Sequence, residues 1–97
     1  MDTRVNVERI LGLADGDAHV IRNAGALVTD DVKRSLETSR SLGTRELVLL
    51  VHTDCAVRNG DLDRAVREDL AELGGRVRGM VYDVDSGELR EVQKPPG

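Results

Sequence analysis

The sequence has 97 residues, which is enough for one small domain and too few for two. Its net charge is −4, with acidic and basic residues interspersed, and it has no basic patch with interleaved aromatic residues, so we expect no nucleic-acid binding. No apolar run approaches the roughly 20 residues that cross a bilayer, and no signal peptide is evident, so we expect a cytoplasmic protein without membrane contact. The single cysteine excludes an internal disulfide and is compatible with a reducing compartment.

Aromatic residues are almost absent, with one tyrosine and no phenylalanine or tryptophan. The core must therefore be built from valine, leucine, isoleucine and alanine. A domain of this size buries a modest fraction of its surface. We expect association with a second copy to stabilise it.

The first third of the chain predicts a short helix and a short strand. Apolar residues at helical spacing between positions 5 and 13 indicate one or two helical turns that end at Gly12. A loop follows, and residues 18–21 have the composition of a short strand. This strand leads into a polar turn at residues 22–25, which contains Gly25.

A capped helix and a buried strand follow. Thr29 offers a helix N-cap, and Asp30 and Asp31 place acidic groups in the first turn, where they favour the helix dipole. A narrow apolar stripe then runs to Gly43, which predicts the end of the helix. The apolar run at residues 47–51 does not alternate, which is typical of a strand buried on both faces in a parallel sheet flanked by helices.

The last third of the chain predicts a helix and a hairpin. Asp61 can cap a helix that ends at the Gly74–Gly75 pair, and residues 77–84 read as a strand with a hairpin partner at residues 88–92. Helices and strands alternate, so we predict an α/β fold with a mainly parallel sheet and an antiparallel hairpin at its C-terminal edge. We expect one domain over residues 1–92 and a flexible tail over residues 93–97.

The candidate site lies where the apolar run ends in His52-Thr53-Asp54-Cys55. Chemistry collects beyond the carboxyl ends of parallel strands, and imidazole and thiolate are zinc ligands. A catalytic zinc needs a third protein ligand, for which His19 and Asp2 are candidates without a decisive spacing. A cysteine phosphatase would need an arginine six residues after Cys55, where Asp61 stands. A thiol hydrolase pairing Cys55 with His52 or His19 has no further support.

Several motifs together resemble the β-class carbonic anhydrases. They are Met1-Asp2-Thr3-Arg4, the stretch from Gly16 to Gly25, Val28-Thr29-Asp30-Asp31, Leu42-Gly43-Thr44-Arg45-Glu46, His52-Thr53-Asp54-Cys55, and the segments around Val77-Arg78-Gly79 and Tyr82-Asp83-Val84. The resemblance implies reversible hydration of carbon dioxide to bicarbonate at a zinc ion. It also implies dimers or higher oligomers, with active sites near the subunit interface.

The resemblance assigns roles to individual residues. His52 and Cys55 match two of the family's three zinc ligands. Asp2 and Arg4 match an aspartate–arginine pair in which the arginine holds the aspartate away from the metal. Arg22, Asn23 and Gly25 are expected to shape the pocket, the alternative being ordinary turn residues and a glycine that supplies a positive φ. Asp54 is expected to be a local hydrogen-bond acceptor and not a metal ligand. Outside these motif roles, we expect His19 to be a core or interface histidine within the short strand and Tyr82 to contribute packing.

Three departures from the family pattern bear on activity. The family's first cysteine ligand directly precedes the Met-Asp-x-Arg segment, and neither it nor the central strand before it is present. The segment between the His-Thr-Asp-Cys motif and the last helix is short, and Ala56 replaces a glycine. We therefore expect a truncated, impaired zinc lyase. The alternative is a non-catalytic remnant that binds zinc weakly or acts as an oligomeric interaction module.

Overall fold

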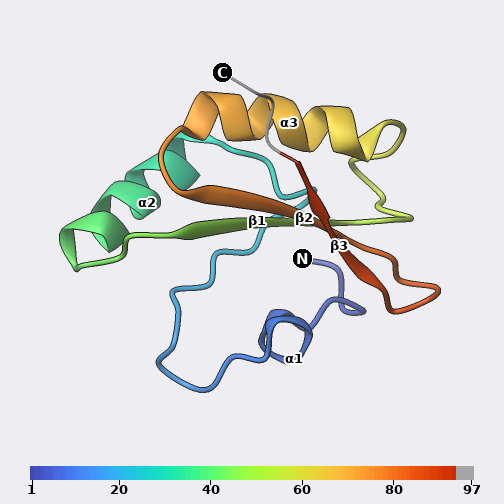
Figure 1. The fold of residues 1–97 in the computed structure, drawn as a ribbon, viewed down its shortest axis with the longest axis horizontal. Helices are drawn as coiled ribbons and strands as arrows, with labels where there is room; N and C mark the ends of the chain where they lie inside the picture. The colour runs from blue at the N-terminus through green and yellow to red at the C-terminus, as the bar shows by residue number, and fades with distance from the viewer. Residues whose placement is uncertain (94–97) are drawn as a thin grey trace.

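A computed structural model describes residues 1–93 and shows a mixed three-stranded sheet with helices (Figure 1). The elements are α1 (Val7–Leu11), α2 (Asp30–Ser41), β1 (Leu47–His52), α3 (Leu62–Leu73), β2 (Val77–Tyr82) and β3 (Leu89–Val92). The strand order is β1-β2-β3, with β1 parallel and β3 antiparallel to β2. The predicted α/β fold with a C-terminal hairpin is confirmed. No helix within residues 1–93 is both long and apolar enough to cross a bilayer.

The helix ends follow the local chemistry of the sequence. Thr29 caps α2 by accepting a hydrogen bond from the Val32 N–H at 3.3 Å, and Asp61 caps α3 by accepting one from the Arg64 N–H at 3.0 Å. α1 ends at Gly12, which adopts a left-handed conformation with φ of 68°. The predicted caps at Thr29 and Asp61 and the predicted stops at Gly12 and Gly74 are therefore confirmed, whereas α2 ends at Ser41, before the predicted stop at Gly43.

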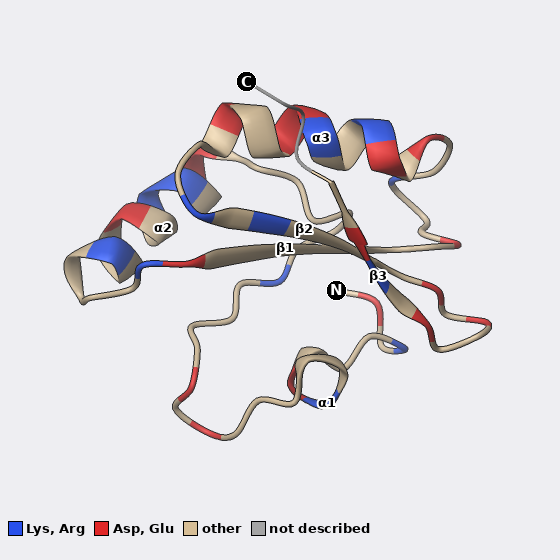
Figure 2. Cartoon of the chain, in the orientation of Figure 1, with Lys and Arg blue, Asp and Glu red and all other residues tan. Residues whose placement is uncertain are grey.

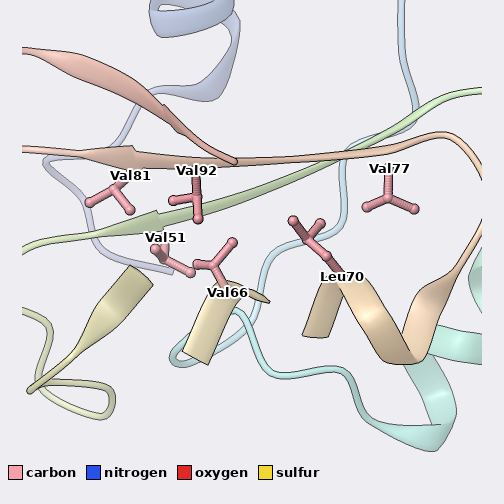
Figure 3. Packing of buried hydrophobic residues seen from close by; sticks show 6 residues of the cluster. All are labelled: Val51, Val66, Leu70, Val77, Val81 and Val92. Carbon is pink, nitrogen blue, oxygen red and sulfur yellow. The ribbon is translucent and has the colours of Figure 1, made fainter. Parts of the chain in front are cut away.

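The core lies between α3 and one face of the sheet. Val66 and Leu70 of α3 are 0% and 1% exposed, and they pack among four strand valines (Figure 3): Val51, Val77, Val81 and Val92. Gly79 in β2 makes this close approach possible. A Cβ atom added there would lie 2.3 Å from Val66 Cγ1 and 3.2 Å from Leu70 Cδ1. The missing side chain of Gly79 thus sets the distance between helix and sheet.

Two strand predictions are wrong. Residues 18–21 form no strand, because within residues 1–93 they have no neighbouring strand with which to share backbone hydrogen bonds. β1 is not buried on both faces: Val51 is buried, whereas Val48 is 37% exposed. Its position at the edge of the sheet explains that exposure.

Near the end of the described chain, the structure differs in one strand boundary from the prediction. β2 ends at Tyr82, earlier than predicted, because the Asp83 carboxylate accepts the N–H groups of Asp85 and Ser86 and starts the turn. Residues 94–97 of the predicted flexible tail lie outside the described part of the chain. The boundary at residue 92 stays a prediction.

The contact at Gly79 predicts a specific double-mutant result. Gly79→Ala should lower the free energy of unfolding by about 1–3 kcal/mol, because the new methyl group overlaps Val66 Cγ1. Val66→Ala removes that atom, so the double variant should be more stable than the sum of the two single effects predicts. Urea unfolding of the four proteins checks this; additive losses would contradict the contact.

An ion pair between α3 and β3 predicts acid sensitivity. Arg90 Nη1 and Nη2 donate to Asp63 Oδ2 and Oδ1 at 2.7 and 2.6 Å, and the Arg90 side chain holds the pKa of Asp63 below its ordinary 3.8. The unfolded chain thus binds the proton more readily. The contribution of the ion pair to stability is present above the ordinary pKa of Asp63 and is lost as the pH falls through the pKa of Asp63 in the folded state.

Urea unfolding across a pH series measures this effect. Asp63→Asn should lower stability at neutral pH and make the loss of stability on acidification shallower. Glu68→Gln is the matched control, since its exposed pair with Arg64 should change stability by less than about 0.5 kcal/mol. An acid slope in Asp63→Asn equal to that of the parent chain would refute the assignment.

Candidate active site

The candidate site is fixed at the carboxyl end of β1 by Thr53. The Thr53 N–H donates to the Tyr82 carbonyl at 2.9 Å, and Thr53 Oγ1 accepts the Val84 N–H at 3.1 Å. Asp54 follows with a φ of 51°, so the chain turns sharply after the strand. Cys55 comes directly after this turn and is 7% exposed.

His52 is held with one ring nitrogen free. Its Nδ1 lies 2.7 Å from the Thr53 carbonyl oxygen, which can only accept a hydrogen bond, so Nδ1 carries a hydrogen. In the neutral ring the lone pair is then on Nε2, as in many metal-binding histidines. Nε2 lies 3.9 Å from Asp2 Oδ2, and the side chain is 12% exposed.

Cys55 has a polar environment despite its burial. Its Sγ accepts the N–H groups of Val57 at 3.4 Å and Arg58 at 3.3 Å, an arrangement suited to a sulfur that carries negative charge. The loop that supplies these donors is anchored by a salt bridge of 2.8 Å between Arg58 and Asp69, both about 15% exposed. Asn59 also donates to the Cys55 carbonyl.

Asp2 and Arg4 form a tight pair beside His52. Arg4 donates to Asp2 through its Nη2 at 2.7 Å, its Nε at 3.0 Å and its backbone N–H at 2.8 Å. These hydrogen bonds, first from the side chain and then from the backbone, hold the pKa of the Asp2 carboxyl far below its ordinary value. Asp2 also raises the pKa of the Arg4 guanidinium. The Asp2 carboxylate is thus ionised, and both of its oxygens are held by Arg4.

Asp54 is a third member of this group that the sequence did not reveal. Arg4 Nη1 donates to Asp54 Oδ2 and Nη2 donates to the Asp54 carbonyl, both at 3.0 Å. Asp54 is a hydrogen-bond acceptor as expected, but its partner Arg4 is distant in sequence and not local. No spacing rule links residues 50 positions apart, so only the fold could reveal the contact. Arg4 joins the N-terminal segment to the turn between His52 and Cys55.

Arg22, Asn23 and Gly25 support the N-terminal segment. Arg22 donates to the carbonyls of Asp2 and Val5, each at 2.8 Å. The Asn23 side chain closes a loop by exchanging hydrogen bonds with the Leu27 backbone at 2.8 and 3.0 Å. Gly25 has a φ of 86°, and a Cβ there would lie 2.9 Å from a methyl carbon of Val57. Their pocket-shaping role stays a prediction.

His19 lies apart from the site. Its Nδ1 is 2.5 Å from Ser39 Oγ on α2, and Ser39 Oγ lies 2.8 Å from Thr44 Oγ1. The residue is exposed and lies outside any strand, so it is not a core histidine; a position at an interface between subunits stays a prediction. Its ring fastens the segment before α2 to that helix. Tyr82, by contrast, contributes to the site only through its carbonyl.

The donors present do not complete a catalytic zinc site. Such a site takes three protein ligands, and these 97 residues contain one cysteine. His52 Nε2 and Cys55 Sγ are suitable donors, but both oxygens of Asp2 are bonded to Arg4. Within residues 1–93, no group of three or more histidine, cysteine, aspartate or glutamate side chains could hold a metal ion. The described residues by themselves do not fit the metal.

Together these features define an α/β protein with a histidine–cysteine pair and an arginine-bound aspartate at a strand end. The carbonic anhydrase family model matches residues 1–72. β-Carbonic anhydrase 1 of Mycobacterium tuberculosis is 41% identical over 126 residues, covering 95% of this chain and 77% of that protein. The crystal structure of carbonic anhydrase from Streptococcus mutans matches with a TM-score of 0.89 and 40% identity, covering 96% of this chain and 77% of that one.

The chain therefore belongs to the β-class carbonic anhydrase family. A carbon disulfide hydrolase of Saccharolobus solfataricus is also similar, with 50% identity over 58 residues, covering 59% of this chain and 28% of that protein. The aligned length of 126 residues with the mycobacterial protein exceeds the 97 residues of this chain. That relative thus has residues within the alignment that have no counterpart here.

The two hydrogen bonds of Arg22 predict how the N-terminal segment is held. Arg22→Ala should speed hydrogen exchange at the Arg4 and Val5 amides by at least about tenfold, roughly one charge-assisted hydrogen bond. Arg22→Lys, which cannot span both carbonyls, should have an intermediate effect. Exchange measured by NMR checks this, with exposed Arg9→Ala as control. Unchanged exchange in Arg22→Ala would contradict the anchoring role.

Proposed function

We propose that this chain is a carbonic-anhydrase-like zinc lyase for the reversible hydration of carbon dioxide to bicarbonate, with an incomplete metal site. One observation carries the proposal: the free Nε2 of His52 and the sulfur of Cys55 lie at the same strand end as the Asp2–Arg4 pair. Family membership supports the reaction class.

Asp2 and Arg4 act as the gate of the proposed site. Arg4 holds both carboxylate oxygens of Asp2, which keeps this anion from turning toward Nε2 of His52. The ionised carboxylate can accept a hydrogen bond from a hydroxyl group placed beside His52. Arg22 fixes the backbone of the same segment. Together these groups orient a polar reactant without changing their own charge near neutral pH.

The incomplete donor set predicts low activity. With His52 and Cys55 as the two available donors, we expect weak zinc binding and little hydration of carbon dioxide by the 97-residue chain. The lack of a third suitable donor beside His52 and Cys55 within residues 1–93 supports this expectation.

Metal analysis and a stopped-flow assay of carbon dioxide hydration test this proposal. The purified chain should hold well under one zinc per chain, and hydration should stay close to the rate in buffer. His52→Ala and Cys55→Ser should each weaken the residual zinc binding measured by calorimetry, whereas His19→Ala, at the other histidine, should not. One zinc per chain with zinc-dependent hydration would show that the site is complete and the impairment wrong.

A second candidate function is a non-catalytic remnant that acts as an interaction module. It is favoured by the lack of a three-donor group within the described residues and by exposed apolar side chains such as Leu42 and Val57. We also propose a homodimer or higher oligomer and a cytoplasmic location. A His52→Ala/Cys55→Ser variant that keeps the oligomeric state of the parent chain and shows no loss of carbon dioxide hydration relative to it would favour the module over the enzyme.

A further inference from the structure

The loop that joins β1 to α3 contains the dipeptide Asn59-Gly60. Both residues are exposed and lie outside any helix or strand. Gly60 has a φ of 89°, and apart from its chain neighbours no atom lies within 4 Å of the place where a Cβ would stand. Within residues 1–93, the Gly60 N–H has no hydrogen-bond acceptor. The nitrogen of this peptide bond is therefore unhindered and free to react.

The side-chain amide of Asn59 is the group with which this nitrogen can react. The Gly60 nitrogen gives its proton to a base in the solvent and attacks Asn59 Cγ. The bond between the nitrogen and Cγ forms, the bond between Cγ and Nδ2 breaks, and the amide takes up a proton and leaves as ammonia. Water then opens the resulting succinimide at either carbonyl carbon, which gives aspartate or isoaspartate. A side chain on the second residue would hinder the attack, and glycine has none.

The chain has two further asparagines, and the structure restrains both of them. Asn6 caps α1 by accepting the Arg9 N–H at 2.9 Å, and the β-branched side chain of Val7 crowds the nitrogen that would have to attack. The Asn23 side chain exchanges two hydrogen bonds with the Leu27 backbone, at 2.8 and 3.0 Å. We expect both side chains to lose their amides slowly.

We propose that Asn59 is a deamidation site, at which attack by the Gly60 nitrogen converts asparagine into aspartate and isoaspartate and loosens the loop that holds Cys55. The reaction consumes water and requires no enzyme or other reactant. The site is independent of the proposed lyase function, since it uses neither a metal ion nor carbon dioxide.

The effect on the loop follows from the hydrogen bonds around Cys55. Asn59 Nδ2 donates to the Cys55 carbonyl, and the N–H groups of Val57 and Arg58 in the same loop donate to Cys55 Sγ at 3.4 and 3.3 Å. An ionised aspartate or isoaspartate has no side-chain hydrogen to donate, so the bond to the Cys55 carbonyl is lost and two acceptors face each other. Isoaspartate also inserts the former side-chain carbon into the main chain.

The new carboxylate also acts on the salt bridge that anchors the loop. Acidic residues already flank the loop, as the red segments after β1 and at the start of α3 show (Figure 2): Asp54 precedes it and Asp61 follows it. Arg58 is the basic residue between them, and it is bonded to Asp69 on α3 at 2.8 Å. A negative charge on the residue next to Arg58 competes with Asp69 for this guanidinium.

Peptide mass spectrometry of the folded chain tests the site. During incubation in mildly alkaline buffer, Asn59 should lose its amide at least about tenfold faster than Asn6 or Asn23, because glycine leaves the attacking nitrogen unhindered. The product should be a mixture of aspartate and isoaspartate, with one ammonia released per converted chain. The Asn59→Gln variant, whose longer side chain disfavours this ring, should stay unmodified. Equal rates at the three asparagines, or aspartate as the sole product, would overturn the proposal.

Hydrogen exchange measured by NMR tests the effect on the loop. The Val57 and Arg58 amides should exchange about fivefold faster in Asn59→Asp than in the parent chain, roughly the effect of one lost hydrogen bond. Asn59→Gln, which keeps an amide donor, should change them less, and the Thr53 amide, whose acceptor lies in β2, is the internal control. Incubated parent chain gives the same measurement if circular dichroism shows that Asn59→Asp does not fold. Unchanged exchange at Val57 and Arg58 after conversion would refute the loosening of the loop.

Discussion

The contact between α3 and β2 at Gly79 is the constraint on which the rest of the structure depends. β2 is the only described strand that pairs with both others, and α3 covers it with Val66 and Leu70. The absence of a side chain at Gly79 lets the helix come close enough to bury both residues fully. β1 is then aligned by its parallel register with β2, and the end of β1 carries the site.

Hydrogen bonds from arginine side chains, more than apolar packing, hold the N-terminal segment. Residues 1–5 form no strand or helix; Val5 is buried, and guanidinium groups donate several hydrogen bonds within and to the segment. Arg4 reaches the turn after β1, and Arg22 reaches the carbonyls of Asp2 and Val5. Two arginines thus connect a segment with little regular structure to a rigid sheet. The position of the Asp2 carboxylate depends on these contacts more than on the hydrophobic core.

Local chemistry made most of the fold predictable. Caps such as Thr29 and Asp61 and the stop at Gly12 act within a few residues, so the sequence alone reveals them. The β1 run and the C-terminal hairpin were likewise evident. The exposure of one face of β1 and the absence of a strand at residues 18–21 could not be predicted, because both depend on whether a neighbouring strand is present, which no local pattern can report. Of the site, the motif identified His52 and Cys55, but the link from Arg4 to Asp54 arises from tertiary structure.

The continuity of α3, β2 and β3 in the chain has a consequence for the order of folding. These elements lie within residues 62–92 and enclose most of the buried cluster, so they can associate after closing short loops at low entropic cost. Joining β1 requires closing a longer connection through α3, and the N-terminal segment attaches only when the turn at Asp54 exists to receive Arg4. We therefore expect the donors at His52 and Cys55 to be assembled before Arg4 positions the Asp2 carboxylate beside them.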